Sequence, residues 1–434
     1  MVKKYLPIIM FLHMALVYSL EEDLHNPFNV VWAAKTYECP ETFGIPLDFE
    51  KYGIIANKND HWKGDKISLL SRNDLGLYPY YDKNGTAVNG GIPQLTNLTE
   101  HFEKLCEDFW KYFPDPNYSG WIVIDWEPWR PIWERNWDAK KIYKTASISL
   151  VQERHKDWPD DLIEEVAKFE FETAARNLIQ GTLNLCKKLR PYALLGLYEF
   201  PKCYKFSGQG TCSEAIQREN DELQWLYDSS TALFPSIYVS YKQSDVKDFV
   251  KAALTEAKRV TLKSEHSNKP IYPFGRFNYS HTYFYFTNVD LENTIGQSVT
   301  EGMAGIVLWG DYNDSNSAPT CLGLKHYLDT MLGPYILNVT KFARKCSEAY
   351  CSGHGRCIRK DDDGYHGDES QKIDELQLLK QRIWSQYTES EIYGNIIFKN
   401  KKETKVQYSF TETKYGMYGC QCYSGWHGNQ CNKS

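Results

Sequence analysis

An α/β fold built around a closed β/α barrel is the fold class that the sequence predicts for most of this 434-residue chain. Short apolar runs alternate along the chain with stretches in which apolar residues recur at helical spacing. Strands that alternate with helices imply right-handed crossovers and a parallel sheet. About seven such units over roughly 300 residues favour a closed barrel over an open sheet.

The apolar runs are the predicted strands, because each is short and bounded by turn-forming residues. They are Asn29–Ala33, Lys66–Leu70, Trp121–Glu127, Ala193–Tyr198, Ser236–Tyr241, Pro270–Phe274 and Ala304–Trp309. Helices are predicted over Leu98–Tyr112, Pro159–Leu189 and Asp245–Leu262. In the second helix acidic residues complement the positive amino-terminal end, and basic residues complement the negative carboxyl-terminal end.

The amino-terminal segment predicts export from the cell. Lys3 and Lys4 precede an apolar run from Tyr5 to Tyr18 that is too short to span a membrane, so residues 1–19 are expected to be a signal peptide. No later run is long enough to span one either. The even count of 12 cysteines agrees with an oxidising, extracellular destination. Several sequons suggest a secreted glycoprotein, with candidate sites at Asn84, Asn97, Asn117, Asn278, Asn313, Asn338 and Asn432.

The formal net charge of −6 argues against a general attraction to nucleic acid or to any other polyanion. An anionic ligand would therefore need a local cationic patch. Candidates for such a patch are Arg130, Arg135, Lys140, Lys141 and Lys144. The lysines fit a solvated helix face equally well.

Two carboxylates close the third predicted strand and are the strongest candidates for catalysis. Side chains alternate across a strand, so Asp125 and Glu127 share one face with Val123. Adjacent acids at the end of an apolar strand are costly unless they are hydrogen-bonded or one keeps its proton. A carboxyl that keeps its proton is a ready general acid. A structural ion pair with Arg130 is the alternative, and these residues alone do not decide between the two.

A barrel would gather the polar ends of several strands at one mouth, because barrel active sites lie at the carboxyl ends of the strands. The strand ends carry Tyr198 with Glu199, Tyr238 with Tyr241, and Trp309 with Asp311 and Tyr312. Convergence of these groups with the two acids would favour catalysis over the ion pair. Scattered polar decoration of the strand ends is the alternative.

Four blocks of the sequence, in the right order, resemble the hyaluronidase family. The stretch from Trp121 to Trp137 is similar to the family's catalytic segment, and Leu197–Tyr204 is similar to its next strand end. Two further blocks match at residues 230–238 and 305–310. The resemblance covers nearly the whole mature chain. It implies a distorted, TIM-like β/α barrel at residues 20–340 and a secreted endo-β-N-acetylhexosaminidase that cleaves hyaluronan and, more slowly, chondroitin.

The resemblance also implies a retaining, substrate-assisted mechanism in which the substrate's own acetamido oxygen attacks the anomeric carbon. Glu127 would be the proton donor, and Asp125 would orient the acetamido group and stabilise its charge. Neither a metal ion nor a cofactor is required. The implied substrate-binding residues are Tyr198, Tyr238, Trp309 and Arg130, the last of which would hold the carboxylates or meet a uronate. Tyr198 and, more readily, Trp309 could instead be core residues.

Three positions depart from the family pattern. Trp32 is followed by Ala33 and Ala34, where family members usually carry Asn-Val-Pro. Ser71 stands where a tyrosine that contacts substrate often follows the third strand, and Pro128 stands where an acidic residue is common. None of these changes removes the acid, but they put the substrate preference and the rate in doubt.

Residues 341–434 resemble an epidermal-growth-factor-like (EGF-like) module with a charged insertion at about residues 360–405, in which one helix is expected near residues 373–387. Six cysteines there allow fifteen pairings. The family pattern implies Cys346–Cys357, Cys351–Cys420 and Cys422–Cys431, and in the barrel Cys39–Cys321 and Cys203–Cys212. Cys106 and Cys186 remain on helices expected to be neighbours, and we predict an additional disulfide between them.

Two functions remain open. One is an active secreted hyaluronidase, and the other is a glycosaminoglycan-binding or adhesion protein that keeps the scaffold but turns over poorly. The retained Glu127 favours the enzyme. A polysaccharide is the expected partner, and a monomer is the expected state.

Overall fold

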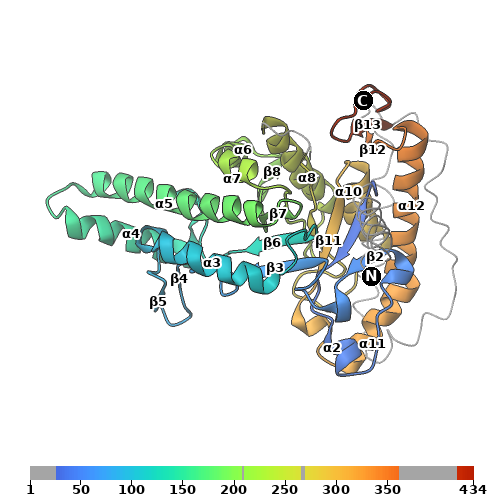
Figure 1. Cartoon of the computed structure of the whole chain (residues 1–434), viewed down its shortest axis with the longest axis horizontal. Coiled ribbons are helices and arrows are strands. Elements are labelled where there is room, and N and C mark those ends of the chain that lie inside the picture. The colour runs from blue at the N-terminus through green and yellow to red at the C-terminus, as the bar shows by residue number, and fades with distance from the viewer. Residues whose placement is uncertain (1–25, 208–209, 265–268, 361–417) are drawn as a thin grey trace, which may run out of the picture.

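Parallel strands form the centre of the molecule and helices lie outside them (Figure 1). The structure is a computed structural model that describes residues 26–207, 210–264, 269–360 and 418–434. The expected signal peptide and almost all of the charged insertion, including the helix expected near residues 373–387, lie outside the described residues. Within them, no helix is both long and apolar enough to cross a bilayer.

Two parallel sheets form the wall of a distorted, TIM-like barrel. One has the order β10-β11-β1-β2 and the other the order β3-β6-β7. Their strands are β1 (Asn29–Trp32), β2 (Ile54–Ala56), β3 (Ile67–Ser71), β6 (Trp121–Asp125), β7 (Leu194–Leu197), β10 (Phe274–Arg276) and β11 (Gly305–Trp309). Isolated bridges join the two sheets through the extended segment 233–236, which lies between β7 and β10.

The strand prediction was correct for most of the wall and wrong at three places. Residues 236–241 form only isolated bridges, and the strand expected at residues 270–274 begins at Phe274. Strand β2 was missed because three residues are too few to establish an alternating pattern.

A side chain bridges the gap in the wall between β2 and β3. The Asn57 carboxamide oxygen accepts hydrogen bonds from the backbone amides of Lys66 and Ile67, at 2.8 and 2.9 Å. Its nitrogen donates to the Ile67 carbonyl at 2.7 Å. Asn57 is buried, so these bonds are shielded from water and replace part of a backbone ladder.

Alternation along each strand divides the apolar residues between two cores. Val31, Val123 and Val307 belong to the core inside the barrel. Ile122 and Ile124, one position away from Val123, belong to the larger core between strands and helices. Asp125 follows the same alternation as Val123 and therefore points toward the barrel interior.

The three predicted helices are present, as α3 (Leu98–Tyr112), α5 (Asp160–Leu189) and α8 (Val246–Lys263). Helices α4 and α5 lie side by side and extend away from the strands (Figure 1). The other α-helices are α2 (Glu38–Glu41), α4 (Lys141–Arg154), α6 (Glu214–Asp221), α7 (Gln224–Ser229), α9 (Asn288–Leu291), α10 (Gln297–Thr300), α11 (Ala318–Tyr327) and α12 (Gly333–Tyr350).

Short elements complete the described chain. Antiparallel pairs form between β4 (Tyr80–Tyr81) and β5 (Ala87–Val88), between β8 (Phe206–Ser207) and β9 (Thr211–Cys212), and between β12 (Gly355–Arg359) and β13 (Tyr418–Cys422). Single 3₁₀ turns lie at Glu50–Tyr52, Lys58–Asp60, Pro93–Leu95, Trp133–Arg135, Asp138–Lys140 and Tyr312–Asp314, and π-helical turns lie at Glu292–Gly296 and Leu328–Leu332.

Five disulfides have the pairings that the family resemblance implies. They are Cys39–Cys321, Cys203–Cys212, Cys346–Cys357, Cys351–Cys420 and Cys422–Cys431. The sixth, between Cys106 and Cys186, is wrong, because both residues are free thiols. Burial raises the pKa of Cys186, and Cys106 raises it further, so this thiol stays protonated. A protonated thiol is a poor partner for disulfide formation.

Candidate active site

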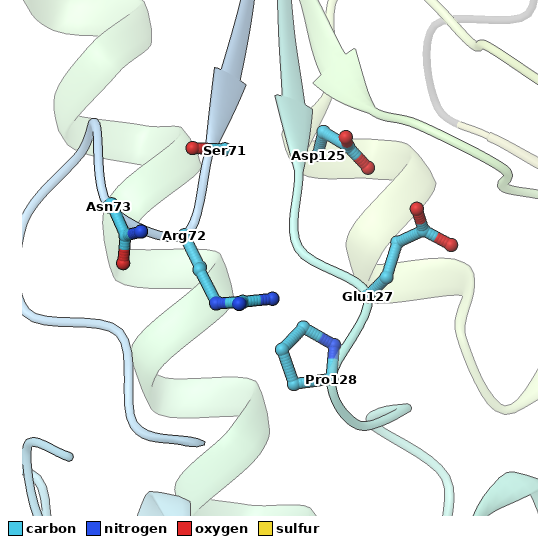
Figure 2. Close-up of a pocket in the computed structure, with 6 residues that line it drawn as sticks. All are labelled: Ser71, Arg72, Asn73, Asp125, Glu127 and Pro128. Carbon is cyan, nitrogen blue, oxygen red and sulfur yellow. The ribbon is translucent and has the colours of Figure 1, made fainter. Parts of the chain in front are cut away.

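The two predicted acids lie at the carboxyl end of β6, inside the mouth of the barrel. Asp125 is the last residue of the strand, and Glu127 follows two positions later. Asp125 is partly buried, whereas half of the Glu127 side chain is exposed. Figure 2 shows both carboxyl groups on the same side of the chain. The alternation of the strand orients Asp125, and the two residues that follow β6 place the Glu127 carboxyl group on the same side.

Two cavities share these two acids as lining residues. One, of about 190 Å³, is called here the aromatic cavity and is lined by the two acids with Tyr198, Tyr238, Phe274, Arg276, Trp309 and Asp311, among others. The other, of about 230 Å³, is called the arginine cavity and is lined by the two acids with Ser71, Arg72, Asn73 and Pro128 (Figure 2). The two acids thus stand between two spaces, each large enough for part of a sugar.

Burial raises the pKa of Asp125 to about 7, and the neighbouring Glu127 adds to this shift by charge repulsion and by a hydrogen bond. The Oδ1 atom of Asp125 is buried and has no hydrogen-bond partner within the described chain. Such an atom is costly to bury without a partner. The arrangement can therefore share one proton between two carboxyls and offer a free oxygen to a ligand.

Arg130 lies beneath the acids and is engaged by carboxylates. It is 5% exposed and pairs with Glu199, which also pairs with Lys202. Its second guanidinium contact is with Glu127, at 3.6 Å between Nη2 and Oε2, and its Nη1 donates to the Glu127 carbonyl at 2.9 Å. Lys140 donates to the Glu127 and Pro128 carbonyls. Both ion pairs of Arg130 are thus with carboxylates, and neither is with Asp125.

Aromatic rings form the wall of the aromatic cavity. The Tyr238 ring stacks on the Trp309 ring, with 6.0 Å between the centroids, and its centroid lies 6.2 Å from that of the Tyr198 ring. The side chains of Tyr238 and Tyr198 are hydrogen-bonded to each other. Burial raises the pKa of both tyrosines, so their hydroxyls stay protonated and can donate or accept hydrogen bonds. All three residues, predicted separately from three strand ends, come together here.

Arg276 is a site residue that the sequence prediction missed. Its guanidinium lies 5.1 Å from the Trp309 ring centroid and pairs with Asp311 at 2.8 Å and with Asp314 at 3.2 Å. It fixes the orientation of the tryptophan. The strand-end rule would have found it if the predicted strand had continued past Phe274 to the end of β10.

Several other expected residues lie outside the two cavities. Tyr241 packs on Tyr279 and Phe284, and the exposed Tyr312 lines neither cavity. Arg135 is buried and bonds to Glu219 at 2.7 Å. The candidate cationic patch is therefore not a single surface.

Asn278 is a correction to the predicted glycosylation sites. It is 1% exposed, its amide nitrogen donates to Asp314 at 2.6 Å, and its oxygen accepts from Arg276 at 3.0 Å. A glycan on this nitrogen would break a buried network that supports the site. Asn338 is partly exposed, and the remaining sequons are exposed, at Asn84, Asn97, Asn117, Asn313 and Asn432.

Paired carboxyls in an aromatic-walled cavity at the mouth of a β/α barrel define a glycoside hydrolase. Within the described residues, no three His, Cys, Asp or Glu side chains are grouped so that they could hold a metal ion. The groups that line the aromatic cavity include acid–base side chains and aromatic rings.

Comparison with known proteins gives the family. A family model described as hyaluronidase matches residues 22–434. Hyaluronidase-1 of Homo sapiens is 36% identical over 422 residues, which cover 94% of this chain and 93% of the relative. Hyaluronidase-2 of Homo sapiens is 36% identical over 418 residues, which cover 94% of this chain and 86% of the relative. The chain belongs to the hyaluronidase family.

A solved structure supports the same assignment. Bee venom hyaluronidase, in complex with a hyaluronic acid tetramer, superposes with a TM-score of 0.67 at 33% sequence identity. The match covers 72% of this chain and 99% of the bee venom chain.

Proposed function

We propose that this protein hydrolyses internal β-1,4 N-acetylhexosaminide bonds of hyaluronan, by a retaining, substrate-assisted mechanism. The observation that carries the proposal is the coupled pair of acids, one half-exposed and one with a buried, unpartnered oxygen, between two cavities. The hyaluronic acid tetramer bound by the bee venom relative supports the choice of polymer.

The closeness of the two acids favours an internal nucleophile. Ordinary retaining glycosidases place an acid and a nucleophile about 5–5.5 Å apart on opposite sides of the bond. Asp125 and Glu127 share one face and a hydrogen bond, so both approach the sugar from the same side. The acetamido oxygen of the hexosamine then attacks the anomeric carbon, and the bond from that carbon to the leaving oxygen breaks.

Glu127 supplies and recovers the proton. Its carboxyl protonates the leaving oxygen, and its carboxylate then removes a proton from the water that opens the cyclic intermediate. The free oxygen of Asp125 accepts the acetamido N–H and stabilises the positive charge that develops on that group. Tyr198 and Tyr238 position the acetamido group, and Trp309 forms the wall beneath the sugar.

Replacement of Glu127 tests the catalytic assignment. Glu127→Gln is expected to slow release of reducing ends from purified hyaluronan by about 10²–10⁴-fold, because the amide cannot donate the acid's proton. Binding of a hyaluronan oligosaccharide, followed by calorimetry, should persist. Glu214→Gln is a matched control, because this α6 carboxylate is exposed and lines neither cavity.

The same measurement addresses the alternative, a glycosaminoglycan-binding protein with weak turnover. That interpretation is correct if the wild type and Glu127→Gln bind hyaluronan equally and both leave it uncut. Unsulfated chondroitin, which differs from hyaluronan in its hexosamine, serves as a second substrate for ranking preference.

We also propose that the protein is secreted after removal of residues 1–19 and acts as a monomer. Residues 341–434 are proposed to form an EGF-like module, supported by three disulfides and by the antiparallel pair β12 and β13. Amino-terminal sequencing and light scattering of the exported protein check the first two statements.

A further inference from the structure

The arginine cavity contains a cation that the proposed mechanism does not use. Ser71 ends β3, the neighbour of β6 in the barrel wall, and Arg72 and Asn73 follow it. Figure 2 shows the Arg72 side chain extending toward Pro128, across the hollow from Glu127. The aromatic cavity shares both acids with this hollow, so the two cavities are neighbours at the mouth of the barrel.

The position of Arg72 is set by a neighbouring aromatic ring. Its guanidinium lies 4.6 Å from the centroid of the Tyr80 ring. The Tyr80 hydroxyl donates to the Asn73 side chain at 3.2 Å. A guanidinium stacked on a ring keeps its edge N–H groups available to an acceptor. The contact with the Tyr80 ring therefore orients Arg72 and does not use the N–H donors of its guanidinium group.

Arg72 brings a positive charge to this cavity. Within the described chain Arg72 makes no ion pair. The nearby Asp74 is occupied by Lys63 at 2.5 Å, Tyr112 at 2.9 Å and the Ser71 hydroxyl at 2.6 Å. Burial alone would raise the pKa of Asp74, but these hydrogen bonds hold it below its ordinary value.

Two other arginines, Arg276 in the lining of the aromatic cavity and Arg130 in contact with Glu127, are already paired with carboxylates. Arg130 contacts Glu199 and Glu127, and Arg276 contacts Asp311 and Asp314. Both are almost fully buried, whereas Arg72 is exposed. Of these three guanidinium groups, Arg72 is the one with donors open to a ligand.

We propose that Arg72 binds the carboxylate of the uronate next to the N-acetylhexosamine whose bond is cut. This inference rests on the proposed function. In a polymer that alternates hexosamine with uronate, both neighbours of a hexosamine in the aromatic cavity are uronates. Whichever neighbour enters the arginine cavity therefore brings a carboxylate to a planar guanidinium, a geometry that allows two parallel hydrogen bonds.

Binding in an inactive background tests the proposal directly. A hyaluronan oligosaccharide is expected to bind Glu127→Gln/Arg72→Gln about tenfold more weakly than Glu127→Gln, because a charge-assisted hydrogen bond is lost. The same oligosaccharide with its carboxylates reduced to alcohols should bind both proteins equally. In an active background, Arg72→Gln should raise KM and leave kcat nearly unchanged, and Arg72→Lys should recover part of the loss.

A control variant shows whether the loss depends on the position of the charge. Arg218→Gln removes the same charge from α6 and should change nothing, because Arg218 lines neither cavity. Equal affinity of the two Glu127→Gln proteins for native oligosaccharide overturns the proposal, as does an equal loss on the reduced one. A larger loss on chondroitin 4-sulfate than on unsulfated chondroitin would assign Arg72 to sulfate and also overturn it. If the wild type binds but does not cleave hyaluronan, the proposed function fails and this binding comparison still decides the inference.

Discussion

Asp125 keeps its proton at a pH where an isolated aspartate would have lost it. Burial and, after it, the neighbouring Glu127 together raise the pKa of Asp125 to about 7, because a buried charge beside a second negative charge is costly. Asp125 is hydrogen-bonded to Glu127, so its proton lies between the two carboxyl groups. This residue-scale property links burial to the acid chemistry of the site.

The pH dependence of the reaction follows from that shared proton. A pKa raised above its ordinary value means that the protonated form persists below about pH 7 and is lost as the pH rises through it. We expect kcat/KM to fall by about tenfold per unit of pH on the alkaline side. The measurement is a profile of reducing-end release between about pH 5 and pH 9.

Asp125→Asn is the companion variant. It removes the repulsive charge, so the alkaline limb should move, and it exchanges a charge-stabilising carboxylate for a neutral amide, so the rate should fall by about 10²-fold. A profile that stays flat through neutral pH in the wild type would contradict the shared proton.

At the scale of elements, helices α3 and α5 are joined by a buried histidine. His101 Nε2 lies 2.9 Å from the Thr182 hydroxyl, and Nδ1 accepts the Leu77 backbone amide at 2.9 Å. Because Nδ1 accepts, the ring proton is on Nε2 and the ring is neutral. Burial lowers the pKa of His101 to about 4. The contact therefore depends on a histidine that does not take up a proton at mildly acidic pH.

Acidification should lower the unfolding free energy of the protein through this histidine. Between its ordinary pKa of 6.5 and about 4, the unfolded chain takes up a proton at His101 that the folded chain does not. Stability is thus lost as the pH falls through this window, by roughly 2–3 kcal/mol for this group. Urea unfolding of wild type and His101→Gln at about pH 7 and pH 4.5 measures the difference. The variant should be less stable at neutral pH and less sensitive to acid, and parallel pH dependence of the two proteins would contradict this role of His101.

At the scale of the whole molecule, one disulfide joins the two ends of the barrel sequence. Cys39 follows β1, and Cys321 follows β11, its partner in the sheet. The two cysteines are 282 positions apart in sequence, and both are fully buried. In the chain-entropy view, a cross-link that closes so long a loop restricts the unfolded chain strongly.

Removing this cross-link should cost more than removing a local one. Cys39→Ala/Cys321→Ala is expected to lose about 2–5 kcal/mol of unfolding free energy. Cys203→Ala/Cys212→Ala is the matched control, because its disulfide spans only 9 positions. Denaturant unfolding with the proteins kept oxidised gives both values. A greater loss in the local variant would exclude loop closure as the source of the stabilisation.

Local sequence patterns were sufficient to predict the helices and strands in which apolar residues recur at regular spacing. Helix α3 begins and ends at the predicted residues, because its apolar positions recur over several turns. The alternation in β6 correctly placed Asp125 on the inner face. Strand β2 and the segment 233–236 were not predicted as they occur, because short extended segments take their conformation from neighbours that are distant in sequence.

The sequence by itself determined the barrel class, the family and the pair of acids, because alternation and motif spacing are local properties of the chain. Only the tertiary structure decided which charges are paired and which cysteines are bonded. Arg130 and Arg276 are paired, Arg72 forms no ion pair within the part of the chain that the structure describes, and Cys106 and Cys186 remain thiols. Asn278 matches a glycosylation motif but is buried by the fold. Pairing and burial depend on distances through space between residues far apart in sequence, and no local pattern records those distances.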